Sequence, residues 1–330
     1  MRKLCLCIAL FSSAASAQIV APAGHRIVVA HDGVVEIYGS SRGGAPEKHP
    51  GVKNANAVIV GPDRVAILDS YANEARLIPG GLIQTAETPI AGIFIGNDLF
   101  VLARDASAVE RIRPDGSRAT VRVAADPAFL REVDGLIYVY SRLDGLMQAI
   151  DPVSLRVVRR ATIARFASDF ETDGRNGYLL MPREALIIAF PLATLVSAAR
   201  IPAGTVPTDL AMTNRASVIS AVRIAVADPS ARRVWTIEGA QSVGGAFGRG
   251  LVRGLLGLGL YRPGDTDFPS GVDRVLSRGG ITVAYDSSTR TLYRVGEKSR
   301  VIASAVGPDA FTIIGDRVAF WRDGALRYTP

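Results

Sequence analysis

The segment Ile224–Glu238, IAVADPSARRVWTIE, decides how this 330-residue sequence folds. Two short apolar runs flank a polar turn, a pattern that predicts an antiparallel β-hairpin. The apolar residues of IAVA are consecutive, which is typical of a strand that is buried on both faces. Variants of the segment occur along most of the chain. The sequence therefore predicts a repeated β-hairpin unit.

The spacing of these units indicates how they are arranged. Equivalent strands begin near Val65, Leu99, Leu136, Tyr178, Ile224, Ile281 and Val318, at intervals of about 34 to 57 residues, as in propeller blades. One small sheet cannot bury both of its faces, whereas sheets stacked around an axis cover one another. We therefore predict an all-β protein with a β-propeller fold.

The number of blades follows from the number of units and from the chain ends. Seven blades are favoured, and eight blades or an incomplete ring are the alternatives. A further hairpin is predicted at Arg26–Ala30 and Val34–Tyr38, around Asp32-Gly33. In a seven-bladed ring these N-terminal strands would complete the last blade, so that the N- and C-terminal strands close the ring and remove exposed edges.

Several units resemble known propeller repeats. The segments IAVADPSARRVWTI, ITVAYDSSTRTLYRV and VAILDSYANEARLI are similar to the NHL repeat, in which an apolar strand, an Asp, a turn, an Arg and a second apolar strand follow one another. The segments LIYVYSRLDGLMQAIDPVSLRVVRRATI and ARIPAGTVPTDLAM resemble the YVTN repeat. This resemblance implies a propeller architecture and leaves the function open, because one fold carries many functions.

The N-terminus has the pattern of a signal peptide. Arg2 and Lys3 precede the apolar run Leu4–Phe11, and Ala15-Ser16-Ala17 forms a small-residue cleavage site. We expect residues 1–17 to be removed and residues 18–330 to form one propeller domain in the periplasm or outside the cell. The apolar run is too short for a transmembrane anchor. The only cysteines, Cys5 and Cys7, lie in the signal, so no disulfide is expected in the mature chain.

Charge and composition restrict the classes of partner. The chain is 48% hydrophobic and 21% charged, with a net charge of +7 that comes mostly from scattered arginines. Scattered basic residues are typical of a solvated surface, and export makes nucleic acid an unexpected partner. The oligomeric state is left open.

Acidic and histidine side chains form no recognisable catalytic or metal-binding motif. Asp69, Asp105, Asp228 and Asp286 recur after strands, where Asp commonly accepts backbone hydrogen bonds in a turn. The cluster of Asp265, Asp267 and Asp273 departs from the EF-hand pattern, so calcium is left open and no cofactor is predicted. Asp169, Glu171 and Asp173 are interpreted as solvated loop acids. The only histidines, His25, His31 and His49, lack the companions of a zinc site.

One segment departs from the repeats. An insert at about residues 240–267, expected between the units that begin near Ile224 and Ile281, contains GGAFGRGLVRGLLGLGLYRPG, Gly244–Gly264. If it were helical, its leucines and its glycines would form separate stripes. It is interpreted as a loop folded over a propeller face or the central channel, a docking segment for a protein, or a segment that touches a membrane surface. The candidate binding residues are Phe247, Arg249, Leu251, Arg253, Leu255, Leu258, Tyr261 and Arg262.

Together these features predict an exported, non-catalytic β-propeller. We expect it to act as a binding or scaffold module that recognises a protein or a cell-surface ligand through one face and the Gly-rich insert. The alternative is a metal-dependent propeller hydrolase or lyase, similar to a lactonase, with its site in the central channel.

Overall fold

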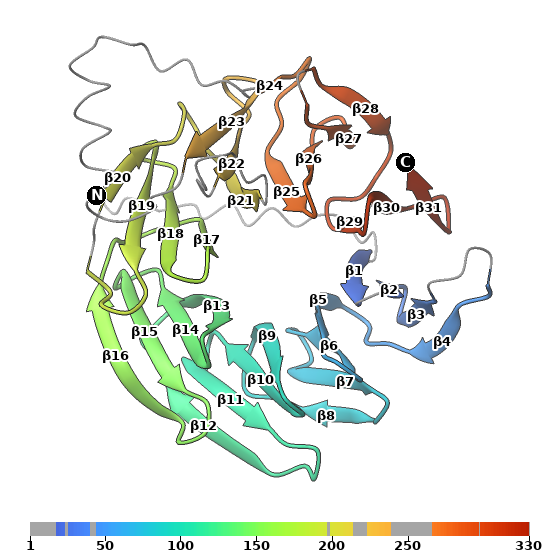
Figure 1. The fold of residues 1–330 in the computed structure, drawn as a ribbon. Coiled ribbons are helices and arrows are strands. Elements are labelled where there is room, and N and C mark those ends of the chain that lie inside the picture. Colours follow the sequence, from blue (N-terminus) through green and yellow to red (C-terminus); the bar gives the residue numbers. More distant parts are fainter. Residues whose placement is uncertain are drawn as a thin grey trace, which may run out of the picture.

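The computed structural model describes residues 18–23, 26–39, 44–196, 199–213, 223–238, 266–296 and 298–329. In these ranges every regular element is a β-strand, and the strands form eight separate antiparallel sheets. The sheets stand side by side around a central axis (Figure 1). The protein is a β-propeller with eight blades in the described residues, the alternative count rather than the favoured seven.

The blades follow one another along the chain. Blade 1 consists of β1 (Ile19–Ala23), β2 (Arg26–His31), β3 (Val34–Tyr38) and β4 (Glu47–Pro50), and blade 2 of β5 (Ala55–Val60), β6 (Val65–Asp69), β7 (Glu74–Ile78) and β8 (Leu82–Gln84). Blade 3 consists of β9 (Pro89–Ile95), β10 (Asp98–Ala103), β11 (Ala108–Ile112) and β12 (Arg118–Arg122). Blade 4 consists of β13 (Pro127–Val133), β14 (Leu136–Ser141), β15 (Leu146–Asp151) and β16 (Arg156–Thr162).

Blade 5 consists of β17 (Asp169–Thr172), β18 (Asn176–Met181), β19 (Leu186–Pro191) and β20 (Ala199–Pro202), and blade 6 of β21 (Asp209–Thr213), β22 (Arg223–Asp228), β23 (Arg233–Glu238) and β24 (Thr266–Asp267). Blade 7 consists of β25 (Arg274–Arg278), β26 (Ile281–Asp286), β27 (Thr291–Arg294) and β28 (Arg300–Ala303). Blade 8 consists of β29 (Phe311–Ile314), β30 (Arg317–Arg322) and β31 (Ala325–Thr329). Blade 8 has three described strands.

The regularly spaced apolar strands of the sequence are the second strands of the blades. Seven of them are β6, β10, β14, β18, β22, β26 and β30, and the N-terminal hairpin supplies the eighth, β2. Every residue of β6 and β26 is buried, because both faces of the second strand are covered by neighbouring blades. The continuous apolar runs therefore correctly indicated strands with two buried faces.

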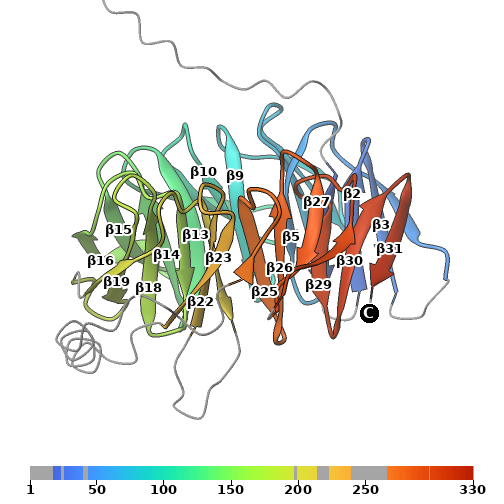
Figure 2. The same ribbon diagram turned by 90° about the horizontal axis from the view of Figure 1, so that it is seen from above.

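Each blade presents its connections to two faces of the molecule. The first strand lies innermost, and successive strands run in opposite directions between the faces (Figures 1 and 2). One face, here the linker face, carries the turns between second and third strands and the connections between blades. The opposite face carries the turns between first and second strands and those between third and fourth strands.

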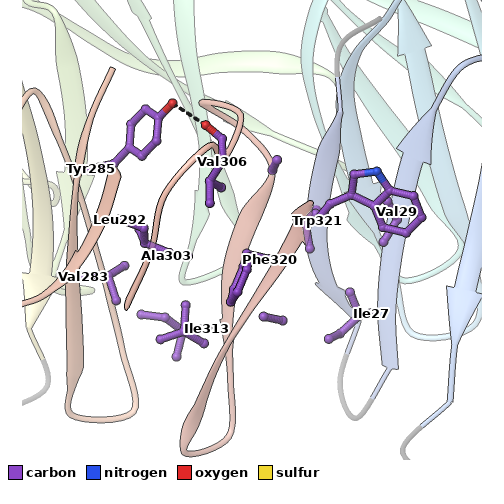
Figure 3. Packing of buried hydrophobic residues seen from close by; sticks show 14 of the residues in the cluster. Ile27, Val29, Val283, Tyr285, Leu292, Ala303, Val306, Ile313, Phe320 and Trp321 are labelled. Carbon is purple, nitrogen blue, oxygen red and sulfur yellow. Dashed lines mark hydrogen bonds between the residues drawn. The ribbon is translucent and has the colours of Figure 1, made fainter. Parts of the chain in front are cut away.

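The ring closes by packing and not by a shared sheet. The expectation that N-terminal strands complete the last blade is wrong, because β1 pairs with β2 and forms blade 1 with β3 and β4. Blades 8 and 1 meet instead through a backbone hydrogen bond from Val20 N to Asp309 O (2.9 Å) and through buried side chains. Trp321 of blade 8 lies against Ile27 and Val29 of blade 1 (Figure 3).

The Asp32-Gly33 turn explains why the N-terminal hairpin stands alone as a blade. Both residues have positive φ, +47° and +71°, as in the tight hairpin turn that Asp-Gly favours. The turn joins β2 to β3, and β4 pairs along the far edge of β3. All four strands of blade 1 are therefore supplied by neighbouring segments of the chain.

Trp321 tests how much stability depends on ring closure. Its side chain is 3% exposed and its indole lies 4.6 Å from the His31 ring. We predict that Trp321→Ala lowers the free energy of unfolding by about 3–5 kcal/mol, because it leaves a cavity between blades 8 and 1. Urea denaturation measures this loss. Tyr71→Ala is the control: Tyr71 is 80% exposed, and a change below about 0.5 kcal/mol is expected. Equal losses in the two variants would contradict the packing argument.

Candidate functional site

The aspartates that recur after the second strands support turns. Asp69, Asp228 and Asp286 are the last residues of β6, β22 and β26, and each is fully buried. Asp286 Oδ1 accepts hydrogen bonds from Ser288 N (2.9 Å) and Thr289 N (3.3 Å). Asp228 accepts hydrogen bonds from Thr205 N (2.5 Å), which lies in the connection from blade 5 to blade 6, and from Trp235 Nε1 (3.1 Å). The interpretation as turn acceptors is confirmed for these three.

Asp105 differs from the other three aspartates. It lies beyond the end of β10, is exposed, and accepts a hydrogen bond from Thr88 Oγ1 (2.5 Å). In blade 4 the equivalent strand ends in Ser141, whose Oγ donates to Ala124 O (3.1 Å).

Asp286 and Asp105 form a matched pair for mutation. Burial acts to raise the pKa of Asp286, but hydrogen bonds from Ser270, Ser288 and Thr289 lower it to about 2. We predict that Asp286→Ala destabilises the fold by about 2–4 kcal/mol, because Ser288 and Thr289 of the turn lose the buried carboxylate that accepts their hydrogen bonds. Asp105→Ala should cost less than about 1 kcal/mol. The contribution of Asp286 is present at neutral pH and is lost as the pH falls through its folded pKa. Urea unfolding at neutral and acid pH tests both statements, and an equal effect of the two variants would refute them.

A second set of acids lies between the inner strands of blades 5 to 7. Asp169 begins β17 and accepts a hydrogen bond from Leu210 N of blade 6 (3.1 Å). Asp209 begins β21 and accepts one from Val275 N of blade 7 (2.8 Å). The two carboxyl groups also face each other closely enough to share a hydrogen bond. Each aspartate thus links its blade to the next.

Basic side chains continue this chain of links on both sides. Arg131 of blade 4 contacts Glu171 Oε1 (3.2 Å), and Arg274 of blade 7 donates to Pro308 O (2.6 Å) and Asp309 Oδ1 (2.7 Å) before blade 8. The interpretation of Asp169 and Glu171 as solvated loop acids is therefore wrong, since both are half-buried on β17. Asp173 lies apart, in the turn on the opposite face, where it accepts from Arg175 N and Asn176 N.

Two carboxyl groups in such a site cannot both be ionised at low cost. Burial, the nearby charge of Asp209 and the hydrogen bond to it raise the pKa of Asp169 to about 8, and burial also raises the pKa of Asp209. Like charges at close range favour a state in which the pair holds one proton. Sequence reasoning missed this pair because Asp169 and Asp209 are 40 residues apart in the numbering and belong to different blades.

The shared proton predicts a particular pH dependence. An ordinary Asp has a pKa of 3.8, well below the folded value for Asp169, so the folded state holds more protons and stability falls as the pH rises towards about 8. Asp169→Asn keeps the shape of the protonated acid and can donate to Asp209. We predict a weaker loss of stability between about pH 5 and pH 8 for this variant, with a higher free energy of unfolding than wild type at about pH 8.

Urea unfolding at several pH values measures this slope. Asp115→Asn is the control, because hydrogen bonds from Ser117 lower the pKa of this exposed turn carboxyl and keep it ionised throughout the window. It should retain the wild-type slope. The same slope in Asp169→Asn would contradict the shared proton.

A groove opens between blades 4 and 5 at the linker face. It has a volume of about 230 Å³ and is lined by apolar and charged side chains of blade 5 and of the connection that follows blade 4. Met181 and Ile188 of blade 5 form its buried floor, and Ile163 and Ala164 of the connection after blade 4 form one wall. We call it the blade 4–5 groove; it is lined by Ile163, Ala164, Arg165, Phe166, Met181, Glu184, Leu186, Ile188 and Arg200.

The wall of the groove is held in place from the core. Tyr140, which is fully buried, donates through its hydroxyl to Ala164 O (2.8 Å) and accepts from Ala167 N (3.0 Å). Gly145, with φ +64°, allows the wall to approach: a Cβ there would lie 2.5 Å from the backbone of Ala164. Phe166 has φ +63°, an uncommon value for a bulky residue. Thr88 before blade 3 and Asp126 before blade 4 also have positive φ, so this backbone conformation recurs in the connections between blades.

The rim of the groove is basic and partly aromatic. Arg165, Arg200 and Glu184 are exposed, and the Phe166 side chain is 50% exposed. The Arg183 guanidinium lies 5.6 Å from the centroid of the Phe166 ring, a cation–π contact. Among the residues that the structure describes, Arg165, Arg183 and Arg200 form no ion pair.

The candidate residues of the insert have no described position. Phe247, Arg249, Leu251, Arg253, Leu255, Leu258, Tyr261 and Arg262 all lie outside the described residues. The described ends show where the insert attaches: β23 ends at Glu238 toward the opposite face, and Thr266 pairs with Val234 near the start of β23. The insert therefore connects the third and fourth strands of blade 6, and does not lie between two units as expected.

The other candidate ligands have separate partners. Asp267 pairs with Arg233 (2.6 Å), Asp273 accepts from Ser287, and Asp265 lies outside the described residues. His31 lies against Trp321, and His49 contacts Glu47 (2.8 Å). Within the described ranges, no group of three or more His, Cys, Asp or Glu side chains is placed to hold a metal ion. The same ranges contain no helix that is long and apolar enough to cross a membrane.

Comparisons with known proteins identify the fold only. No family model and no curated protein sequence matches the chain. The structure is similar to that of BamB from Moraxella catarrhalis, with a TM-score of 0.61, 10% identity and coverage of 94% of each chain. It is also similar to virginiamycin B lyase from Staphylococcus aureus, with a TM-score of 0.53, 11% identity and coverage of 81% of this chain and 90% of that one.

A third similar structure is that of BBS1N in complex with ARL6DN. It has a TM-score of 0.57 and 12% identity, and covers 83% of this chain and 90% of that one. These structures include a lyase and a protein that was determined with a bound protein. At such low identities they support the propeller fold and do not transfer an activity.

Proposed function

We propose that this chain is an exported β-propeller of the NHL/YVTN type that recognises a partner protein or a surface ligand through its linker face, with the Gly-rich insert as a second contact. The observation that carries the proposal is a group of exposed apolar side chains on that face. Leu143, Phe166 and Val206 are 52%, 50% and 45% exposed, and they belong to linker-face connections of blades 4 to 6.

Backbone hydrogen bonds connect the segments that carry these side chains with the segments that line the blade 4–5 groove. Phe166 N donates to Arg142 O (3.1 Å), which places Phe166 beside the turn that holds Leu143. Ala203 N donates to Ala185 O (2.9 Å), which brings the connection with Val206 to the next turn along the ring. Exposed apolar side chains with a polar surround are typical of interaction sites.

The signal-peptide pattern of residues 1–17 supports export. The insert supports a second contact, because its apolar residues would be costly to leave in water. Among similar structures, BBS1N was determined with ARL6DN bound, which is an example of a propeller-like chain that binds a protein.

Affinity capture tests the proposal. Mature chain (residues 18–330) serves as bait for proteins of the exporting cell's envelope and medium. Leu143→Asp/Phe166→Asp should reduce recovery of the partners at least about tenfold, because charges then occupy the apolar contact region. Val153→Asp/Val158→Asp is the matched control, since both valines are exposed and lie in the turn of the opposite face and on β16. Equal recovery by both double variants would contradict recognition through the linker face.

Deletion of Gly244–Gly264 tests the contribution of the insert. The deletion joins the chain within blade 6 and should leave the propeller folded, as circular dichroism can show, while it abolishes or weakens partner recovery. Unchanged recovery would assign recognition to the linker face alone.

The alternative function is an enzyme with a site in the central channel. One observation favours it: Asp169 and Asp209 on the inner strands face each other, and burial raises the pKa of both carboxyl groups. Such a pair is suited to acid–base chemistry. Stoichiometric calcium or zinc in the purified protein, with ligands in the channel, would support the metal-dependent hydrolase or lyase over the binding module.

A further inference from the structure

We infer that the blade 4–5 groove binds one apolar side chain of a partner protein, and that acidic residues of the partner flank this side chain. The inference rests on the proposed function as a binding module and specifies the chemistry of the partner. It follows from the size of the groove, the nature of its floor and the charges at its rim.

The size of the groove fits a side chain and not a whole small-molecule ligand. Its volume of about 230 Å³ lies below the range of roughly 300–1,000 Å³ that is typical of small-molecule sites. Its buried floor of Met181 and Ile188 is apolar, and the charged side chains of the lining lie at the rim. Apolar anchors that fill such pockets contribute much of the binding energy of protein interfaces.

The charges at the rim select the neighbours of that anchor. Arg165 and Arg200 line the groove, and Arg183 adjoins it through Phe166, against a single acid, Glu184. Some arginines elsewhere in the described chain are paired, as Arg142 is with Asp126 and Arg274 with Asp309. The three rim arginines are free of such pairing among described residues, so their donors can bind carboxylates of a ligand.

The wall of the groove is held rigidly, which keeps the entropic cost of binding low. Tyr140 holds Ala164 and Ala167 from the core, and Ile163 N donates to Gly145 O (2.8 Å). The groove exists before the ligand arrives, so binding needs little ordering of the protein. An extended acidic segment can place its apolar side chain in the groove and its carboxylates on the rim.

A positional peptide scan tests the inference with defined probes. The mature protein is applied to an array of octapeptides in which each position is varied in turn, and the best sequence is then measured in solution by fluorescence anisotropy. We expect selection of one large apolar residue with Asp or Glu within two positions of it. Selection without an apolar residue, or with Lys or Arg beside it, would overturn the inference.

Variants of the rim and of the wall test whether the peptide binds at the groove. Arg165→Glu/Arg200→Glu should weaken the selected acidic peptide at least about tenfold and shift the scan towards basic neighbours. Ala164→Trp, which fills the groove and leaves the arginines in place, should remove the preference for the apolar residue. Arg156→Glu/Arg160→Glu is the matched control, because these exposed arginines of β16 change the net charge equally and do not line the groove; a change below about threefold is expected.

The outcomes separate this inference from the proposed function. If acidic–apolar peptides bind at the groove but no partner protein is recovered by affinity capture, the groove chemistry stands and the proposed function fails. If partners are recovered and Arg165→Glu/Arg200→Glu and Ala164→Trp bind them and the peptides like wild type, the proposed function stands and the inference is wrong. Urea unfolding of every variant shows whether its fold is retained.

Discussion

The structure depends on the apolar contact between neighbouring blades. No blade shares a sheet with another in the described chain, so hydrogen bonding between strands does not hold the ring together. Each small sheet has two apolar faces, and it can bury them only against the sheets before and after it. The buried clusters accordingly lie between blades: Val28 and Ile67 belong to the cluster between blades 1 and 2, and Leu99 and Ala66 to the next.

The last contact of the ring is made in the same way as the others. Ile27 and Val29 of blade 1 pack with Trp321 of blade 8, and the cluster continues to Tyr285 of blade 7, whose hydroxyl donates to Val306 O (2.8 Å; Figure 3). Closure therefore depends on side-chain shape at the two ends of the described chain. Hydrogen bonds between inner strands add to this packing, since Asp169 and Asp209 each accept a backbone hydrogen bond from the following blade.

The same arrangement creates the candidate binding surface. Where neighbouring blades pack fully, their apolar side chains are covered, as around Tyr140 and Phe170. At the linker face between blades 4 and 5, the floor of the groove is formed by Met181 and Ile188, which belong to the same buried cluster. The groove is thus an opening of the core, and its rim carries charges that the core excludes. The groove therefore combines an apolar floor with arginines that form no ion pair among the described residues.

The sequence by itself determined the repeat and the buried strands. Runs such as ITVAYD and VAILD have consecutive apolar residues because both faces of a second strand are covered, and a terminal Asp because the following turn needs an acceptor. These are local requirements, so they leave local patterns that can be recognised. The first strands are less uniform: β9 has the apolar sequence PIAGIFI, whereas β17, with the sequence DFET, has no apolar run.

Only the tertiary structure decided the blade count, the closure and the site. Seven and eight units give the same local pattern, and the choice depends on whether β1 pairs with β2 or with the last blade. The Asp169–Asp209 pair and the groove combine residues of different blades, and their proximity follows from the angle between blades. The arginines of the rim looked like scattered surface charge in the sequence, because nothing local shows that Arg165 and Arg200 meet at one apolar opening.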